Sequence, residues 1–159
     1  VPVLKTLNFH ITVIDERKEI IDDFRGGDVV VHQHFADFIQ ENGIKDNSFV
    51  VVCTPTHTYD YHVINKILEL KLNPKYIGML CSIDKLKIYL NETYKKFGNN
   101  INLSNFYSPI GLDLGGGAPE DIAISIAAEI LSIHFEKKGQ KHMREAIDDN
   151  NRYWENKRG

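Results

Sequence analysis

The sequence has few cysteines and no long run of apolar residues. Its 159 residues include only two cysteines, Cys53 and Cys81, which are too few for a disulfide framework and fit a reducing, cytoplasmic setting. No apolar stretch approaches the roughly 20 residues of a membrane span, and the first residues lack the pattern of a secretion signal. We therefore expect a cytoplasmic protein that does not cross a membrane.

An excess of positive charge is also absent. The formal net charge is −3, from 19 Lys and Arg against 22 Asp and Glu, so there is no electrostatic basis for binding nucleic acid. The metal-binding spacings CxxC and HExxH and the hydrolase elbow GxSxG do not occur either. We predict no metal site and assign no catalytic residue.

Apolar strand-like segments alternate with helical segments along the chain. This alternation, with strands that are apolar throughout, predicts a parallel sheet with helices on both faces, a three-layer α/β fold of Rossmann type. Strands are expected at 9–15, 28–32, 48–54, 74–81 and around 107, and helices before Asn8, at 35–42, from about 60 to 70, at 83–97 and at 119–137. We expect Gly43 to end the helix at 35–42 and Ser82 to cap the helix at 83–97.

The beginning of the chain has the pattern of the second half of a βαβ unit. Residues 1–7 match the end of an amphipathic helix, and the strand that follows ends on Asp15. In a dinucleotide-binding unit such an acid meets a ribose hydroxyl, and the strand and glycine-rich turn before the helix lie in the middle of the sheet. We expect this first strand and its turn to be missing here, leaving two rows of backbone groups unpaired unless another chain fills the place. An acid that simply faces solvent explains Asp15 equally well.

The most informative stretch runs from Tyr107 to Asp121 and contains the glycines 115–117. Glycine lets a ligand approach the backbone closely, and a glycine-rich turn before a helix is a ready anion site. Two acids in the first helical turn argue against a highly charged ligand, and a tight turn that uses glycine only for its geometry is the simpler interpretation. The helix from Pro119 is apolar except for a stripe of Ser125, Glu129, Ser132 and Glu136, so we expect it to be buried on most of its surface.

The candidate ligand-binding residues all follow the expected strands, whose carboxyl ends share one edge of a parallel sheet. His57 and Asp60 could act as a base or a hydrogen-bond clamp, although a cap from Asp60 or Thr58 beside an exposed histidine is the simpler alternative. Cys53, Cys81 and His57 could form a thiol or soft-metal site, but such cysteines are more often packing residues. The residues we place at this edge are Asp15, Thr54, His57, Asp60, Gly78, Cys81, Ser82, Asp113, Gly115, Gly116 and Gly117.

We divide the chain into a domain at 1–138 and a charged C-terminal tail or helix at 139–159. Met143, Ile147, Asn150 and Trp154 follow helical spacing, which suits a helix that docks on a partner, and a frayed polar tail is the alternative. The incomplete sheet together with this pattern is compatible with a homodimer.

Several stretches resemble the XdhC/CoxI family, the xanthine dehydrogenase accessory factors. Residues 76–85, YIGMLCSIDK, are similar to the family run YIGMxGSxxK, and 109–115 with 119–130 are similar to PIGLDIG…TPEEIAxSIxAEI. Residues 54–60 resemble a TxxHxxD loop and 13–17 a VxDxR strand end, so the resemblance covers about 11–135. Cys81 and Ala118 depart from the usual glycine and threonine, Thr56 stands where many members have glycine or another polar residue, and the upstream GxGH turn and the separate N-terminal domain of the family are not present.

The resemblance implies a Rossmann-type domain that serves a molybdenum hydroxylase such as xanthine dehydrogenase. Such factors are thought to bind the molybdenum cofactor, protect it during sulfuration and deliver it, a role that involves the hydroxylase and a sulfurtransferase but no substrate turnover. Mapped onto this chain, Asp15 would accept from a ribose or pterin hydroxyl, His57 and Asp60 would orient the ligand, Asp113 would hold the loop or the ligand, and glycines 115–117 would meet an oxyanion. An NAD(P)-dependent oxidoreductase that uses the same edge, and a module that binds only a target enzyme, remain alternatives.

Overall fold

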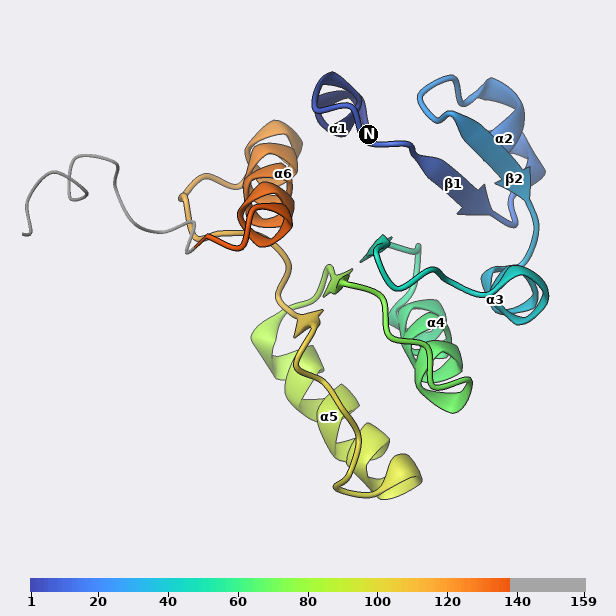
Figure 1. The fold of residues 1–159 in the computed structure, drawn as a ribbon, viewed down its shortest axis with the longest axis vertical. Coiled ribbons are helices and arrows are strands. Elements are labelled where there is room, and N and C mark those ends of the chain that lie inside the picture. The colour runs from blue at the N-terminus through green and yellow to red at the C-terminus, as the bar shows by residue number, and fades with distance from the viewer. Residues whose placement is uncertain (138–159) are drawn as a thin grey trace, which may run out of the picture.

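The computed structural model describes residues 1–137 and shows strands and helices in alternation, as expected (Figure 1). The elements in chain order are α1 (Pro2–Thr6), β1 (Thr12–Asp15), α2 (Lys18–Asp23), β2 (Val29–His32), α3 (Phe35–Asn42), β3 (Phe49–Val52), α4 (His57–Glu69), β4 (Tyr76–Met79), α5 (Ile83–Phe97), β5 (Phe106–Tyr107) and α6 (Pro119–His134). The region 139–159, for which we expect a tail or a docking helix, lies outside the described residues.

Local signals explain most of the element boundaries. Gly43 and Gly98 follow α3 and α5 at φ of 64° and 78°, a left-handed conformation that glycine adopts without strain. Ser82 caps α5 by accepting from the N–H of Lys85, which confirms its expected role. α2 was not expected from the sequence, because none of its six residues is buried and they therefore show no apolar period.

The strands form two separate parallel sheets. β1 pairs with β2, with Thr12 opposite Val29, and β3, β4 and β5 pair in that order, with Phe49 opposite Tyr76. Figure 1 shows the β1–β2 pair apart from the other three strands. In a complete doubly wound sheet the strand that comes first in the chain lies in the middle, and here the middle is the place between β1 and β3. The sheet is therefore divided at the place where the sequence predicts a missing strand.

Two apolar clusters hold the elements together. The larger one packs β3 and β4 against α3, α4 and α5, with Ile64, Ile67 and Met79 fully buried. The smaller one packs α6 on β4 through Tyr76, Ile110 and Ile130. α1 lies against α6, and the ring of Phe9, just before β1, contacts that of Phe49 with centroids 5.6 Å apart.

The expectation that α6 is buried on most of its surface is wrong for its first half. Residues 119–124 are all exposed, Ile124 at 51%, and only Ala127, Glu129 and Ile130 are buried. The polar stripe faces partly inward, because Ser125 and Glu129 hold the preceding loop, and among residues 1–137 nothing buries the apolar first turns. None of the helices in this part of the chain is both long and apolar enough to traverse a bilayer.

Candidate functional site at the strand ends

A bidentate ion pair occupies the end of β1. The Arg17 Nε donates to Asp15 Oδ1 at 2.9 Å and its Nη2 donates to Oδ2 at 2.7 Å, while the backbone N–H of Arg17 also donates to Oδ1 at 2.9 Å. The hydrogen bonds from the Arg17 guanidinium lower the pKa of Asp15, although partial burial opposes them. The acid that we expect at this position is therefore ionised at neutral pH and already paired with an arginine.

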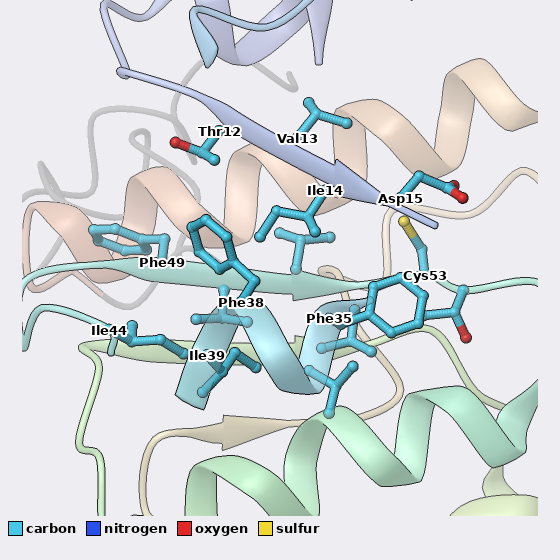
Figure 2. A pocket seen from close by; sticks show the side chains of 15 residues that line it. Thr12, Val13, Ile14, Asp15, Phe35, Phe38, Ile39, Ile44, Phe49 and Cys53 are labelled. Carbon is cyan, nitrogen blue, oxygen red and sulfur yellow. The ribbon is translucent and has the colours of Figure 1, made fainter. Parts of the chain in front are cut away.

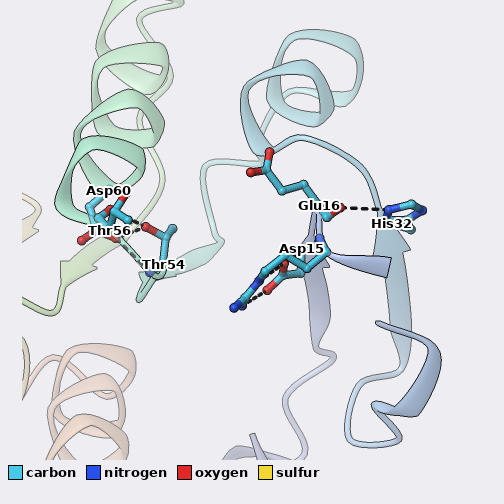
Figure 3. A network of polar contacts seen from close by, with 7 residues as sticks. Asp15, Glu16, His32, Thr54, Thr56 and Asp60 are labelled. Atoms are coloured by element: carbon cyan, nitrogen blue, oxygen red, sulfur yellow. Dashed lines mark hydrogen bonds and ion pairs between the residues drawn. The ribbon is translucent and has the colours of Figure 1, made fainter. Parts of the chain in front are cut away.

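Two histidines lie near the end of β1, and Figure 3 shows one of them, His32, with Asp15 and Glu16. His32, at the end of β2, donates from Nε2 to the carbonyl of Glu16 at 3.0 Å, and His34 Nε2 lies 3.7 Å from the Glu16 carboxylate. Neither histidine was among the residues expected at this site, and Arg17 was noted only as part of the VxDxR motif. Both could have been predicted, because His32 ends β2 and His34 follows it, and the carboxyl end of β2 lies beside that of β1.

The corner between β3 and α4 is built around a buried carboxylate. Asp60, only 2% exposed, accepts from the backbone N–H of Thr54 at 2.9 Å and lies 2.8 Å from the Thr54 hydroxyl. The cap of α4 is Thr56, whose hydroxyl accepts from the N–H of Tyr59, so the expectation of a cap from Asp60 or Thr58 is wrong. Asp60 instead fixes the turn that presents Thr54. His57 is the first residue of α4, and its side chain lies outside the described part.

A cavity of about 290 Å³ lies between the two sheets and brings Asp15 and Thr54 to one site. All residues of β1 and β3 line it, together with Cys53 and apolar side chains of α3 and α4 (Phe35, Phe38, Ile39 and Val63). Figure 2 shows Asp15 and Cys53 at the same end, the one toward which β1 points. The strand-end acid and the Thr54 turn thus flank the mouth of a largely apolar gap.

The cysteines do not have the surroundings of reactive thiols. Desolvation raises the pKa of Cys53, although solvent reaches it in the gap, and the Asp60 carboxylate adds to the rise. Burial, followed by Asp60, also raises the pKa of Cys81, whose Sγ donates to the carbonyl of Ser82 at 3.3 Å. A raised pKa keeps a thiol protonated and weakens it as a nucleophile and as a metal ligand. Among residues 1–137 no group of three His, Cys, Asp or Glu side chains is arranged to hold a metal.

The glycine-rich turn before α6 is capped from within the chain. Asp121 Oδ2 accepts from the backbone N–H groups of Gly117 and Ala118, each at 3.1 Å, which is the half of a capping box that needs no side chain at Ala118. Gly116 has φ of 83°, and a Cβ there would collide with the Asp121 carboxylate. One predicted oxyanion donor, the N–H of Gly117, is therefore already bonded. Asp113 lies exposed before this turn.

Gly78 does not lie at the strand end, where we expected it. It is the third residue of β4 and is buried, and a Cβ there would collide with Ile110 and the Tyr76 hydroxyl. The loop that crosses it is fastened to α6, because Gly111 N–H donates to Glu129 at 3.0 Å and Ser125 donates to the carbonyl of Leu112. Glu129 and Ser125 were missed as loop-holding residues, although their spacing of four puts them on one helix face.

Comparison with known proteins adds a family and three relatives. The model of the XdhC Rossmann domain matches residues 1–130. The chain is 26% identical over 130 residues to the uncharacterized protein YqeB of Escherichia coli (strain K12), covering 80% of this chain and 23% of that protein. It is 37% identical over 81 residues to a probable xanthine dehydrogenase subunit of Bacillus subtilis (strain 168), covering 51% of this chain and 22% of the relative.

A solved structure has the same fold. The crystal structure of a xanthine dehydrogenase from Bacillus halodurans superposes with a TM-score of 0.71 at 28% identity, over 89% of this chain and 41% of that one. The chain therefore spans less than a quarter of the length of either curated relative and less than half of the solved chain.

Proposed function

The chain belongs to the XdhC Rossmann-domain family, and on that premise we propose that it is the ligand-binding part of an accessory factor for a molybdenum hydroxylase of the xanthine dehydrogenase type. In this role it binds the molybdenum cofactor at the strand-end edge and assists its sulfuration and insertion, with the hydroxylase and a sulfurtransferase as partners. The names of the Bacillus relatives support the link to xanthine dehydrogenase.

The observation that supports a ligand site most directly is the convergence of Asp15 and Thr54 on one cavity mouth. The Asp15 carboxylate and the Thr54 hydroxyl can accept hydrogen bonds, and a pterin ring presents N–H donors, so the residues present fit the organic part of the cofactor. No cluster of side chains in residues 1–137 is suited to ligate a metal, so recognition is assigned to the pterin and its phosphate. A binding role also agrees with the thiols, whose raised pKa disfavours covalent chemistry.

Equilibrium binding of molybdopterin cofactor to the full-length protein, under anaerobic conditions, tests the proposal. Asp15→Asn keeps the shape of the side chain but removes its charge, and we expect binding to weaken by about 10- to 100-fold, the range for one charged hydrogen bond. Asp22→Asn is the matched control, because Asp22 pairs with Lys18 on the exposed face of α2. Unchanged cofactor binding in Asp15→Asn and in His57→Ala would contradict this assignment of the site.

A second candidate function, an NADP-dependent oxidoreductase, is favoured by one specific observation. An acid at this position usually meets a ribose 2′-hydroxyl, whereas an arginine beside it accommodates a 2′-phosphate, and here Arg17 is paired directly with Asp15. Titration of the same protein with NADP⁺ and NAD⁺ separates the two functions. Tight binding of NADP⁺ with no binding of the pterin would replace the accessory role by the oxidoreductase.

A further inference from the structure

The hydroxyl of Thr54 has two hydrogen-bond acceptors inside the protein and only one proton. Its Oγ1 lies 2.8 Å from Asp60 Oδ1 and 2.8 Å from the carbonyl oxygen of Thr56 (Figure 3). The same Oδ1 accepts from the backbone N–H of Thr54 at 2.9 Å, and Asp60 is only 2% exposed, so the Thr54 side chain is held against a buried group. Whichever of the two oxygens takes the hydroxyl proton, that proton is directed inward.

The side of the Thr54 hydroxyl that is open to a ligand therefore carries lone pairs and no proton. Thr54 lines the cavity between the two sheets, at the mouth that it shares with Asp15. A hydroxyl has one donor and two acceptor positions, so a group that approaches this oxygen from the mouth must itself donate. A ligand oxygen without a proton would have to break the internal bond of the hydroxyl, which is unfavourable at a partly buried position.

Asp15, on the other side of the mouth, is an acceptor with little room left. Arg17 donates twice to Oδ1, from its backbone N–H and from Nε, and once to Oδ2. With about two lone pairs on each oxygen, one acceptor position remains, on Oδ2. Of the described residues that line the cavity, the other polar ones are Thr12, at the opposite end of β1, and Cys53, whose thiol is only a weak donor. The mouth thus presents two strong acceptors.

We propose that Thr54 determines the hydrogen-bond polarity of this site by accepting from the amino group of a 2-amino-4-oxopyrimidine ring, while Asp15 accepts from the adjacent ring N–H. This edge of the ring carries two neighbouring donors, which match the two acceptors. The carboxylate is the stronger acceptor and takes the more acidic ring N–H, which leaves the amino group to Thr54.

The identity of the ring rests on the proposed function, because the pterin of the molybdenum cofactor carries this edge. Guanine carries the same edge, so a guanine nucleoside is the other source of this chemistry. The role of Thr54 follows from its own contacts and is the same for either ring.

Equilibrium binding of small ring compounds to the full-length protein tests the role of Thr54. Pterin and lumazine differ in that lumazine has an oxo group in place of the amino group. We expect the parent protein to bind pterin about 10- to 100-fold more tightly than lumazine, because the oxo group would face an acceptor. Thr54→Val has nearly the same shape but no hydroxyl. It should lose affinity for pterin and keep its affinity for lumazine, so that the preference falls below about 3-fold.

Two further variants make the result specific. Thr54→Ser keeps the hydroxyl and should keep the preference for pterin. Thr58→Val controls for the loss of a threonine hydroxyl near the start of α4, because Thr58 is exposed and does not line the cavity. Loss of affinity for both rings by the same factor in Thr54→Val would mean that Thr54 only maintains the structure, and the inference would be wrong. A parent protein that binds lumazine as tightly as pterin would overturn it as well.

Guanosine and inosine separate a failure of this inference from a failure of the proposed function. Inosine lacks the amino group of guanosine but keeps the ring N–H. Preference for guanosine that is lost in Thr54→Val, without any binding of pterin, supports the role of Thr54 and contradicts the cofactor role. Absence of binding by all four compounds overturns both.

Neutron diffraction from crystals of the deuterated parent protein tests the polarity without a ligand or a variant. A hydroxyl deuteron of Thr54 that points to Asp60 or to the carbonyl of Thr56 supports the inference. A deuteron that points into the cavity would make Thr54 a donor and would overturn the inference.

Discussion

The hydroxyl of Tyr76 donates a hydrogen bond of 2.5 Å to the carboxylate of Glu129, and both side chains are buried. The same oxygen, Oε2, accepts from the backbone N–H of Gly111 at 3.0 Å. A single carboxylate therefore links β4, α6 and the loop that leads to Asp113 and the glycine turn. The loop is held by Glu129, which lies 18 residues after Gly111, and Glu129 is itself bonded to Tyr76, 53 residues before it.

Replacing Glu129 by glutamine should destabilise the protein. Glutamine keeps the size of the side chain and one acceptor oxygen, which can take the place of Oε2, but it lacks the negative charge that strengthens both hydrogen bonds. We expect the free energy of unfolding to fall by about 2–3 kcal/mol, measured by urea denaturation followed by circular dichroism. Glu136→Gln is the control, because the Glu136 side chain is 84% exposed, and it should change stability by less than about 0.5 kcal/mol. Equal effects of the two substitutions would contradict the role of Glu129.

The glycines of the turn before α6 should differ in their tolerance of alanine. Gly116 has φ of 83° and lies against the Asp121 carboxylate, whereas a Cβ at Gly117 meets nothing within 4 Å. We expect Gly116→Ala to lower the free energy of unfolding by about 1–3 kcal/mol, the cost of a residue held in an unfavourable backbone region. Gly117→Ala should stay within about 0.5 kcal/mol of the parent protein. The order of the two variants in urea denaturation decides the matter, and a reversed order would show that the turn is held differently.

Features of the fold that depend on residues close together in the sequence could be predicted from the sequence alone. The expected strands, the cap at Ser82 and the helix end at Gly43 were found because each depends on residues within a few positions of one another. The family resemblance was likewise visible in contiguous motifs, and the matching family model confirms it.

Long-range contacts account for what the sequence did not reveal. Glu129 was taken as part of a polar stripe on a buried helix, and only the fold places it under Gly111 and Tyr76. Gly78 was taken as a strand-end glycine, and only the fold shows that Ile110 packs where a Cβ at this position would lie. The pairing of Asp15 with Arg17 depends on side-chain conformations that a strand-end pattern does not specify.

The ion pair at the end of β1 should be visible in the titration of Asp15. Its pKa lies below the ordinary value in the folded protein, because the Arg17 guanidinium donates to it. Arg17→Gln should therefore raise the pKa of Asp15, measured by NMR of the carboxyl carbon, and Lys18→Gln should leave it unchanged, because Lys18 pairs with Asp22 instead. Since the folded pKa is depressed, the pair stabilises the fold above the unfolded pKa of about 3.9, and this stability is lost as the pH falls below it. An identical pKa in the parent and in Arg17→Gln would refute the pairing.

The stability of the protein should also decline at alkaline pH through Tyr89. Burial raises the pKa of this tyrosine to about 12, and only 1% of the residue is exposed. The unfolded chain releases the proton near pH 10, whereas the folded chain retains it, so stability is complete below about pH 10 and falls as the pH rises toward 12. Two pH units correspond to about 2–3 kcal/mol for this one group. Tyr76 adds to the decline, because burial and Glu129 raise its pKa as well.

Tyr89→Phe should therefore reduce the slope of the unfolding free energy against pH by an amount equivalent to at most one proton, without abolishing it. Tyr94→Phe is the matched control on the same helix, since Tyr94 is 40% exposed, and an equal reduction in both variants would show that burial of Tyr89 is not the cause.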